Sequence, residues 1–138
     1  MYDVTPKILL VDDIQLNLDL LEEMLEEVNA SYDRAYSGEE ALKKIEEEEY
    51  ALVLLDVQMP GLNGFETAEK IWKLKHGKDL PIIFITAISI EEKFVIKGYE
   101  SGAVDYLVKP FDPILLISKV DVFCRLHIQK KELELKNN

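Results

Sequence analysis

The chain has a single cysteine, and its apolar runs are all too short to suggest a membrane span. With Cys124 alone, no internal disulfide can form, so a reducing, cytoplasmic setting is expected. A bilayer-crossing helix needs about 20 apolar residues. The first residues, MYDVTPK, lack the basic and apolar regions of a secretion signal. The sequence therefore predicts a soluble cytoplasmic protein that does not enter a membrane.

Basic residues are also scarce: 16 Lys and Arg stand against 27 Asp and Glu, which gives a formal net charge of -11 at pH 7. Such a charge repels nucleic acid and anionic membranes, so this chain by itself is not expected to bind either. Apolar residues, in contrast, make up 48% of the 138 residues. This length and composition predict one compact domain with a core of ordinary size.

Short apolar runs alternate with amphipathic stretches along the chain. Five runs predict strands, at residues 8–11, 31–36, 52–55, 82–85 and 106–108. The stretches between them place apolar side chains on one helical face, and the connections are too long for hairpins. Such an alternation requires parallel strands joined by right-handed crossovers. The predicted fold class is therefore α/β, a parallel sheet with helices on both faces.

The last predicted helix is longer than a small sheet requires. It is expected to begin near Asp112 and Pro113 and to continue to about Lys136, a length of roughly 37 Å. Its second half places four side chains at a 3-4-3 spacing, namely Phe123, Leu126, Lys130 and Leu133. This half either begins a two-helix coil, or leads into a further module, or is a solvated tail.

Carboxylates stand at the ends of two of the predicted strands. The stretch ILLVDDIQ ends its apolar run at Asp12 and Asp13, and ALVLLDVQMP ends its run at Asp56. Ligands of open parallel sheets bind at the carboxyl ends of the strands, and these acids converge there if the first and third strands are neighbours. Two carboxylates about 5 Å apart repel by roughly 3 kcal/mol at an effective dielectric near 20. A positive group must offset this repulsion.

Mg²⁺ or Mn²⁺ is the cation that such oxygen ligands favour, whereas zinc usually recruits His or Cys. Lys109 closes the fifth predicted strand and Thr86 the fourth, so both belong to the same edge of the sheet. A carboxylate beside cations can attack phosphorus. We therefore expect Asp56 to be a nucleophile, Asp12 and Asp13 to be metal ligands and Lys109 to be a second cation. Singly, each would pass as a helix cap, a loop acid or a surface lysine; their combination favours a site.

Four segments resemble the receiver domains of two-component response regulators: ILLVDDIQLNLDLL, LVLLDVQMPGLNGFE, PIIFITA and KGYESGAVDYLVKPFD, within about residues 6–123. The resemblance implies a flavodoxin-like (βα)₅ fold with strand order 2-1-3-4-5, an order that the residue pattern does not supply. It also implies a receiver domain at 1–123 and an extension of the last helix at 124–138. The chain would be either a stand-alone regulator or part of a larger protein such as a hybrid kinase.

The resemblance further implies that Asp56 accepts a phosphoryl group from a histidine kinase or a histidine phosphotransfer protein. The chain would then phosphorylate itself from a donor and turn over no external substrate. Asp13 and Asp56 would bind Mg²⁺ directly, Asp12 mainly through water, and the backbone carbonyl of Gln58 would complete the protein ligands.

The same resemblance gives roles to the residues that surround the phosphoryl group. Thr86 and the backbone amide of Ala87 would contact it, and Lys109 would form an ion pair with it across a cis bond to Pro110. Tyr106 would be the switch aromatic, whose ring turns inward and reshapes the surface of helix 4, strand 5 and helix 5. A homodimer would form through that surface or through the C-terminal helix.

Three other functions fit the sequence less well. An aspartyl-phosphate phosphatase needs a second acid two residues after the nucleophile, where this chain has Gln58. A flavin-binding electron carrier needs a hydroxyl- and glycine-rich loop where DDIQLN stands. A pseudo-receiver that binds partners without phosphorylation would not need the intact set Asp13, Asp56, Thr86 and Lys109. The resemblance also implies that Gln58 and Ile88 stand at positions flanking the site that influence the lifetime of the phosphoryl group. Because Ile88 brings no group able to orient water, slow self-dephosphorylation is expected.

Overall fold

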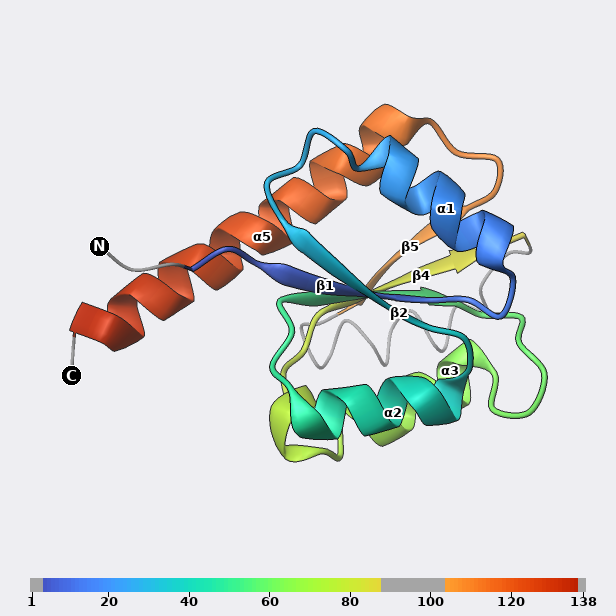
Figure 1. Ribbon diagram of the computed structural model, residues 1–138, viewed down its shortest axis with the longest axis horizontal. Coiled ribbons are helices and arrows are strands. Elements are labelled where there is room, and N and C mark those ends of the chain that lie inside the picture. Colours follow the sequence, from blue (N-terminus) through green and yellow to red (C-terminus); the bar gives the residue numbers. More distant parts are fainter. Residues whose placement is uncertain (1–3, 88–103, 137–138) are drawn as a thin grey trace.

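A five-stranded parallel sheet forms the centre of the molecule (Figure 1), in a computed structural model that describes residues 4–87 and 104–136. The strand order is β2-β1-β3-β4-β5, and each neighbouring pair is parallel. The strands are β1 (Lys7–Val11), β2 (Ser31–Ala35), β3 (Leu52–Asp56), β4 (Ile82–Thr86) and β5 (Val104–Val108). The predicted α/β class and the order 2-1-3-4-5 are both confirmed.

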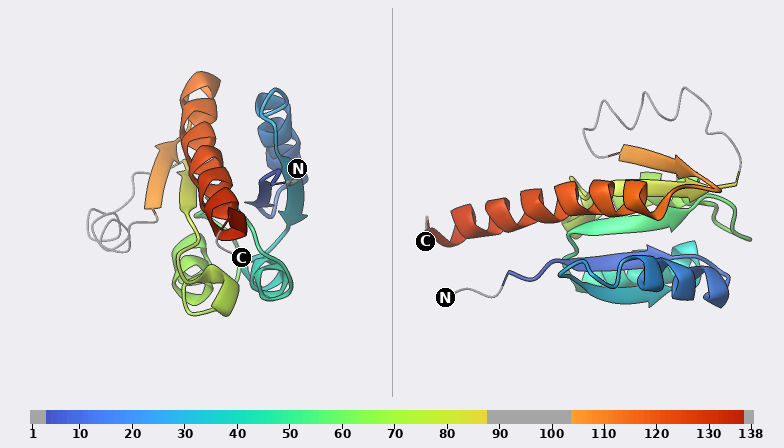
Figure 2. Two further views of the ribbon diagram at one scale, coloured as in Figure 1. Left: turned by 90° about the vertical axis from the view of Figure 1, so that its left-hand side faces the viewer. Right: turned by 90° about the horizontal axis from the view of Figure 1, so that it is seen from above.

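Helices cover both faces of this sheet (Figures 1 and 2). One face carries α1 (Gln15–Met24) and α5 (Pro113–Lys136). The other carries α2 (Gly38–Glu47), α3 (Gly64–Ile71) and the 3₁₀ helix η1 (Lys75–Gly77). In the part of the chain that the structure describes, no helix combines the length and apolarity needed to cross a bilayer.

The central strands are apolar except for one residue at an end of each, because both of their faces are covered. In β3 and β4 every residue is buried, and in β1 only the first residue is partly exposed. Successive side chains alternate between the faces. Leu9 and Val11 therefore join the core under α2 and α3, whereas Ile8 and Leu10 join the core under α1 and α5. The strand β2 lies at an edge and is polar.

The helices α2 and α3 begin at side-chain caps. The Ser37 hydroxyl accepts a hydrogen bond from the Glu40 amide at 3.1 Å. A full capping box forms at α3: the Asn63 side chain accepts from the Glu66 amide at 2.9 Å, and the Glu66 carboxylate accepts from the Asn63 amide at 3.1 Å. These caps fix where each helix leaves the sheet edge that holds the acids.

The helix α5 starts and ends where the sequence predicts. Its first half buries Leu116, Val120 and Cys124 against the sheet. Its second half continues beyond the amino ends of the strands (Figures 1 and 2). There the Lys131 ammonium lies 2.5 Å from the Glu49 carboxylate, which joins the helix to the segment that enters β3.

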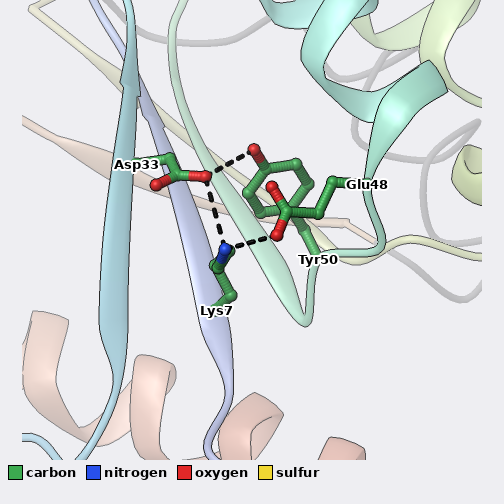
Figure 3. Close-up of polar contacts among 4 residues, drawn as sticks. All are labelled: Lys7, Asp33, Glu48 and Tyr50. Atoms are coloured by element: carbon green, nitrogen blue, oxygen red, sulfur yellow. Dashed lines mark hydrogen bonds and ion pairs between the residues drawn. The ribbon is translucent and has the colours of Figure 1, made fainter.

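Polar contacts also tie the strands together at their amino ends (Figure 3). The Lys7 ammonium of β1 bonds the Glu48 carboxylate and lies 3.8 Å from that of Asp33 in β2. The Tyr50 hydroxyl donates to Asp33 at 2.8 Å. Burial, together with the Asp33 carboxylate, raises the pKa of Tyr50, so it stays a protonated donor. The acids predicted to be functional lie at the opposite end of the sheet.

Candidate functional site

Three carboxylates meet at the carboxyl ends of β1 and β3. Asp56 is the last residue of β3, and Asp12 and Asp13 follow β1 directly. Because these strands are hydrogen-bonded neighbours, one carboxylate oxygen from each acid lies within 4.8 Å of the others. Asp12 and Asp56 are 3% and 8% exposed, and Asp13 is exposed. The convergence that strand-end reasoning predicts is therefore present.

Hydrogen bonds fix the orientation of the two buried acids. The Asp12 carboxylate accepts from the Ile14 amide at 2.9 Å through one oxygen, and from the Asn17 side-chain amide at 3.0 Å through the other. The Asp56 carboxylate accepts from the Gln58 amide at 3.3 Å. Each bond comes from the loop that follows the acid's own strand or from the first turn of α1. The acids thus hold their positions despite their mutual repulsion.

Burial is the main influence on the protonation of this cluster. It raises the pKa of Asp56 to about 6, and the neighbouring Asp12 carboxylate raises it further, while the Gln58 amide and Lys109 oppose the rise. Burial also raises the pKa of Asp12, against the hydrogen bonds from Ile14 and Asn17. Both acids would be easier to ionise beside a divalent cation. An all-oxygen set of this kind fits Mg²⁺ or Mn²⁺.

Lys109 and Thr86 lie at the same edge of the sheet as the acids. The Lys109 amide donates to the Thr86 carbonyl at 2.7 Å, which joins the ends of β5 and β4. The Thr86 side chain is buried, and the positive charge of Lys109 acts on both Asp12 and Asp56. The Lys109–Pro110 peptide bond is cis, as the resemblance implies. Ala87 follows Thr86 and is exposed.

A cavity of about 290 Å³ opens beside the cluster. Asp12, Asn17, Asp56 and Lys109 form its polar wall, and apolar side chains of α1, of the strands β1, β3 and β4 and of the segment before α5 form the rest. Its polar wall adjoins the acid cluster, whereas most of its lining is apolar.

The expected switch residue lies away from this cavity. Tyr106 is in β5, in register with Phe84 of β4, and is 37% exposed. Beside it, the Asp105 carboxylate accepts a hydrogen bond from the Lys119 ammonium of α5 at 2.7 Å. The expected helix 4 and Ile88 fall within residues 88–103, outside the described residues.

Sequence reasoning missed two residues that support the acids. In the sequence, Asn17 is indistinguishable from an ordinary polar helix residue. Only its position about one helical turn after Asp12 could have indicated that it contacts this acid. Gly64 begins α3, and its amide donates to the Val57 carbonyl at 2.9 Å. A Cβ atom there would lie 2.4 Å from the Asp56 carbonyl oxygen. The α3 backbone therefore packs directly on the peptide that carries Asp56.

Residues 8–121 match the sequence model of the response regulator receiver domain. The transcriptional regulatory protein ResD of Bacillus subtilis is 41% identical over 119 residues, which cover 86% of this chain and 48% of ResD. The chain thus spans about half the length of the curated relatives it matches.

Solved structures that include a receiver domain are also similar to this chain. The chemotaxis protein CheY4 of Vibrio cholerae is 29% identical, with a TM-score of 0.76 over 86% of this chain and 98% of that one. The receiver domain of a sensor histidine kinase of Pseudomonas aeruginosa, solved with a magnesium ion coordinated in its active-site cleft, is 28% identical. Its TM-score is 0.74 over 87% of this chain and 98% of that one.

Proposed function

Because this chain belongs to the response regulator receiver domain family, we propose that Asp56 accepts a phosphoryl group from a histidine kinase or a histidine phosphotransfer protein. The observation that carries the proposal is the cluster itself, in which a buried Asp56 shares one site with Asp12, Asp13 and Lys109. An Asp56 oxygen would attack phosphorus, the bond from phosphorus to the donor nitrogen would break, and its electron pair would leave with the histidine.

The metal in this proposal is Mg²⁺ or Mn²⁺. Asp13 and Asp56 would hold it directly, Asp12 through water and Gln58 through its backbone carbonyl, in keeping with the oxygen cluster. When bound, the ion supplies positive charge against the acids and the phosphoryl oxygens. Asn17 would keep Asp12 oriented toward that position.

The remaining contacts would come from the ends of β4 and β5. Lys109 would form an ion pair with a phosphoryl oxygen, and the Thr86 hydroxyl and the Ala87 amide would donate hydrogen bonds to others. The proximity of Lys109 to Asp56 and its backbone bond to Thr86 support this arrangement. Each of these groups binds charge that Asp56 gains on phosphorylation.

Phosphorylation would act as a switch through Thr86 and Tyr106. As Thr86 moves toward the phosphoryl group, the half-exposed Tyr106 ring would turn inward and change the surface of helix 4, β5 and α5. We assign residues 1–123 to this receiver domain and 124–138 to an extension of its last helix. The domain would work in the cytoplasm and turn over no external substrate.

Acetyl phosphate offered with Mg²⁺, followed by intact mass measurement, tests the proposal. The unaltered chain should gain one phosphoryl group, which chelation of Mg²⁺ should prevent. Asp56→Asn should gain none, because an amide is a poor nucleophile. Asp79→Asn, which changes an exposed acid near the opposite end of the sheet, should gain the group normally.

Two results would contradict it. If the unaltered chain keeps its mass, the domain is a pseudo-receiver that binds partners without phosphorylation. If Asp56→Asn is still modified, another residue is the acceptor.

A further inference from the structure

A second cavity lies at the amino ends of β3 and β4, at the opposite end of the sheet from the acids. Its volume is about 510 Å³, within the range of about 300–1,000 Å³ that small-molecule sites commonly have. One wall is the second half of α5, and the other is η1 with the residues that lead into β4. These walls come from opposite faces of the sheet (Figures 1 and 2). The extra length of α5 thus encloses a cavity.

The lining of this cavity is basic, although the chain as a whole is acidic. Four lysines stand against three acids and leave one net positive charge, whereas the whole chain has a net charge of -11. The lysines come from both walls: Lys75, Lys78, Lys130 and Lys131. The acidic remainder of the chain repels a long polyanion such as nucleic acid. The cavity therefore favours a small anion over a large one.

Most of this positive charge is not neutralised by the protein itself. The Lys131 ammonium is engaged, since it lies 2.5 Å from the Glu49 carboxylate and 3.3 Å from that of Glu134. Three lysines of the lining make no ion pair with a described acid: Lys75, Lys78 and Lys130. The charge of Lys130 acts on both Glu49 and His127, so it reaches the cavity. Charges on both walls are thus available to an external anion.

Apolar side chains of both walls also line the cavity. Leu80 and Pro81 lead into β4, and Phe123 and Leu126 belong to α5. Leu126 is 55% exposed, although it is large and apolar. A ligand with a flat ring would remove part of this apolar surface from water, while an anionic group on the same ligand would meet the lysines. The lining therefore suits a ligand that has both parts.

We propose that this cavity binds a small organic phosphate that carries a flat ring, such as a nucleoside monophosphate. Lys75 and Lys78 would bind the phosphate oxygens from one wall and Lys130 from the other, because a lysine ammonium is a compact charge suited to phosphate. The apolar lining would pack against the ring. The site uses neither Asp56 nor a divalent ion, so the proposal is independent of phosphorylation.

Calorimetric titration of the unphosphorylated chain with adenosine monophosphate tests the binding. The buffer is freed of divalent ions, so that the acid cluster at the other end of the sheet repels phosphate. Lys75→Ala and Lys130→Ala should each raise the dissociation constant about fivefold or more, because each removes a charge-assisted bond. Asp79→Asn should lower it, since it removes an acid from the lining. Lys43→Ala is the matched control, because Lys43 is exposed on α2 outside the lining.

His127 gives a second measurement inside the cavity. Burial lowers the pKa of His127, and Lys130 and Lys131 lower it further, against the charges of Glu49 and Glu134. Other charged groups line the cavities on either side of this histidine: Lys7, Lys75, Lys78 and Asp79. A bound phosphate adds negative charge, so the pKa of His127 should rise. Isotope-edited NMR of His76→Gln measures it, since His127 is then the only histidine of the chain.

Smaller probes separate the two parts of the ligand. Inorganic phosphate should bind more weakly than adenosine monophosphate, because it lacks the ring, and adenosine should leave the pKa of His127 unchanged, because it lacks the charge. The proposal is overturned if adenosine monophosphate gives no saturable binding at millimolar concentration, or if inorganic phosphate binds as tightly. It is also overturned if Lys43→Ala weakens binding as much as Lys130→Ala does.

Discussion

At the scale of single residues, burial in the site destabilises the charged forms of its acids. Asp56 is almost fully enclosed and close to another buried acid, so its charged form is destabilised in the free protein. The same enclosure would strengthen every contact that a cation makes with it. A residue that is costly to ionise alone is thus well placed to bind a divalent ion.

This cost makes stability depend on pH when no divalent ion is bound. The pKa of Asp56 rises from 3.8 to about 6 on folding, so the folded chain binds its proton more tightly than the unfolded chain. The contribution of protonated Asp56 to the free energy of unfolding is fully present below about pH 4 and is lost as the pH rises through about 6. At pH 7 the charged Asp56 should cost on the order of 3 kcal/mol.

Asp56→Asn should therefore raise the free energy of unfolding at pH 7 in the presence of a chelator, and the gain should fade near pH 4. Urea unfolding measured across this pH range gives the comparison. Asp79→Asn removes an exposed charge and should show no such trend. A less stable Asp56→Asn protein at pH 7 would refute the argument.

Asn17 should act on the metal through Asp12. Replacing it with Ala removes the donor to one Asp12 oxygen and frees that carboxylate to rotate. Losses of this kind typically reduce metal affinity about 10-fold or more. We therefore expect the Mg²⁺ dissociation constant, measured by calorimetric titration, to rise roughly 10-fold. Asn29→Ala, at an exposed loop residue, should bind Mg²⁺ as the unaltered chain does. Equal affinity in both variants would show that Asn17 has no such role.

At the scale of elements, the strands could be predicted because their apolar runs are short and bounded by polar residues. The acids could be placed at one edge because parallel strands end together. The strand order could not be deduced from the pattern, since a crossover helix may cover either face, and it came from the family resemblance. The contact of Gly64 with the Asp56 peptide was also beyond prediction, because it depends on the approach of α3 to a loop far from any apolar pattern.

Gly64→Ala should test that approach. The added methyl group would meet backbone atoms of Asp56 and Val57 at 2.4 and 2.7 Å, and backbone cannot move aside easily. We expect a loss of about 2–3 kcal/mol in the free energy of unfolding and slower phosphorylation by acetyl phosphate. Gly61→Ala is a control: its φ of 74° is unfavourable for Ala, but the added methyl group would meet only the Glu39 side chain, at an ordinary contact distance of 3.5 Å. A loss of about 1 kcal/mol is therefore expected. If the two variants lose equal stability, the close approach is not limiting.

At the scale of the whole molecule, a divalent ion should stabilise the entire fold. Binding to the native state alone adds about 2.7 kcal/mol when the ion is at 100 times its dissociation constant. Mg²⁺ should therefore raise the thermal midpoint by several degrees, more than NaCl of equal ionic strength does. Asp13→Asn, which removes the exposed carboxylate of the proposed metal site, should lose most of this increase. An identical response to the two salts would argue against a specific site.

Both outer strands of the sheet carry charge that is already engaged. In β2, Arg34 bonds Asp19 and Glu22 of α1 at 2.8 and 2.9 Å, and in β5 Asp105 bonds Lys119 of α5. A foreign strand that tried to extend the sheet at either margin would have to break these bonds and bury the charges. Among the residues that the structure describes, these ion pairs therefore disfavour the addition of a foreign strand to β2 or β5.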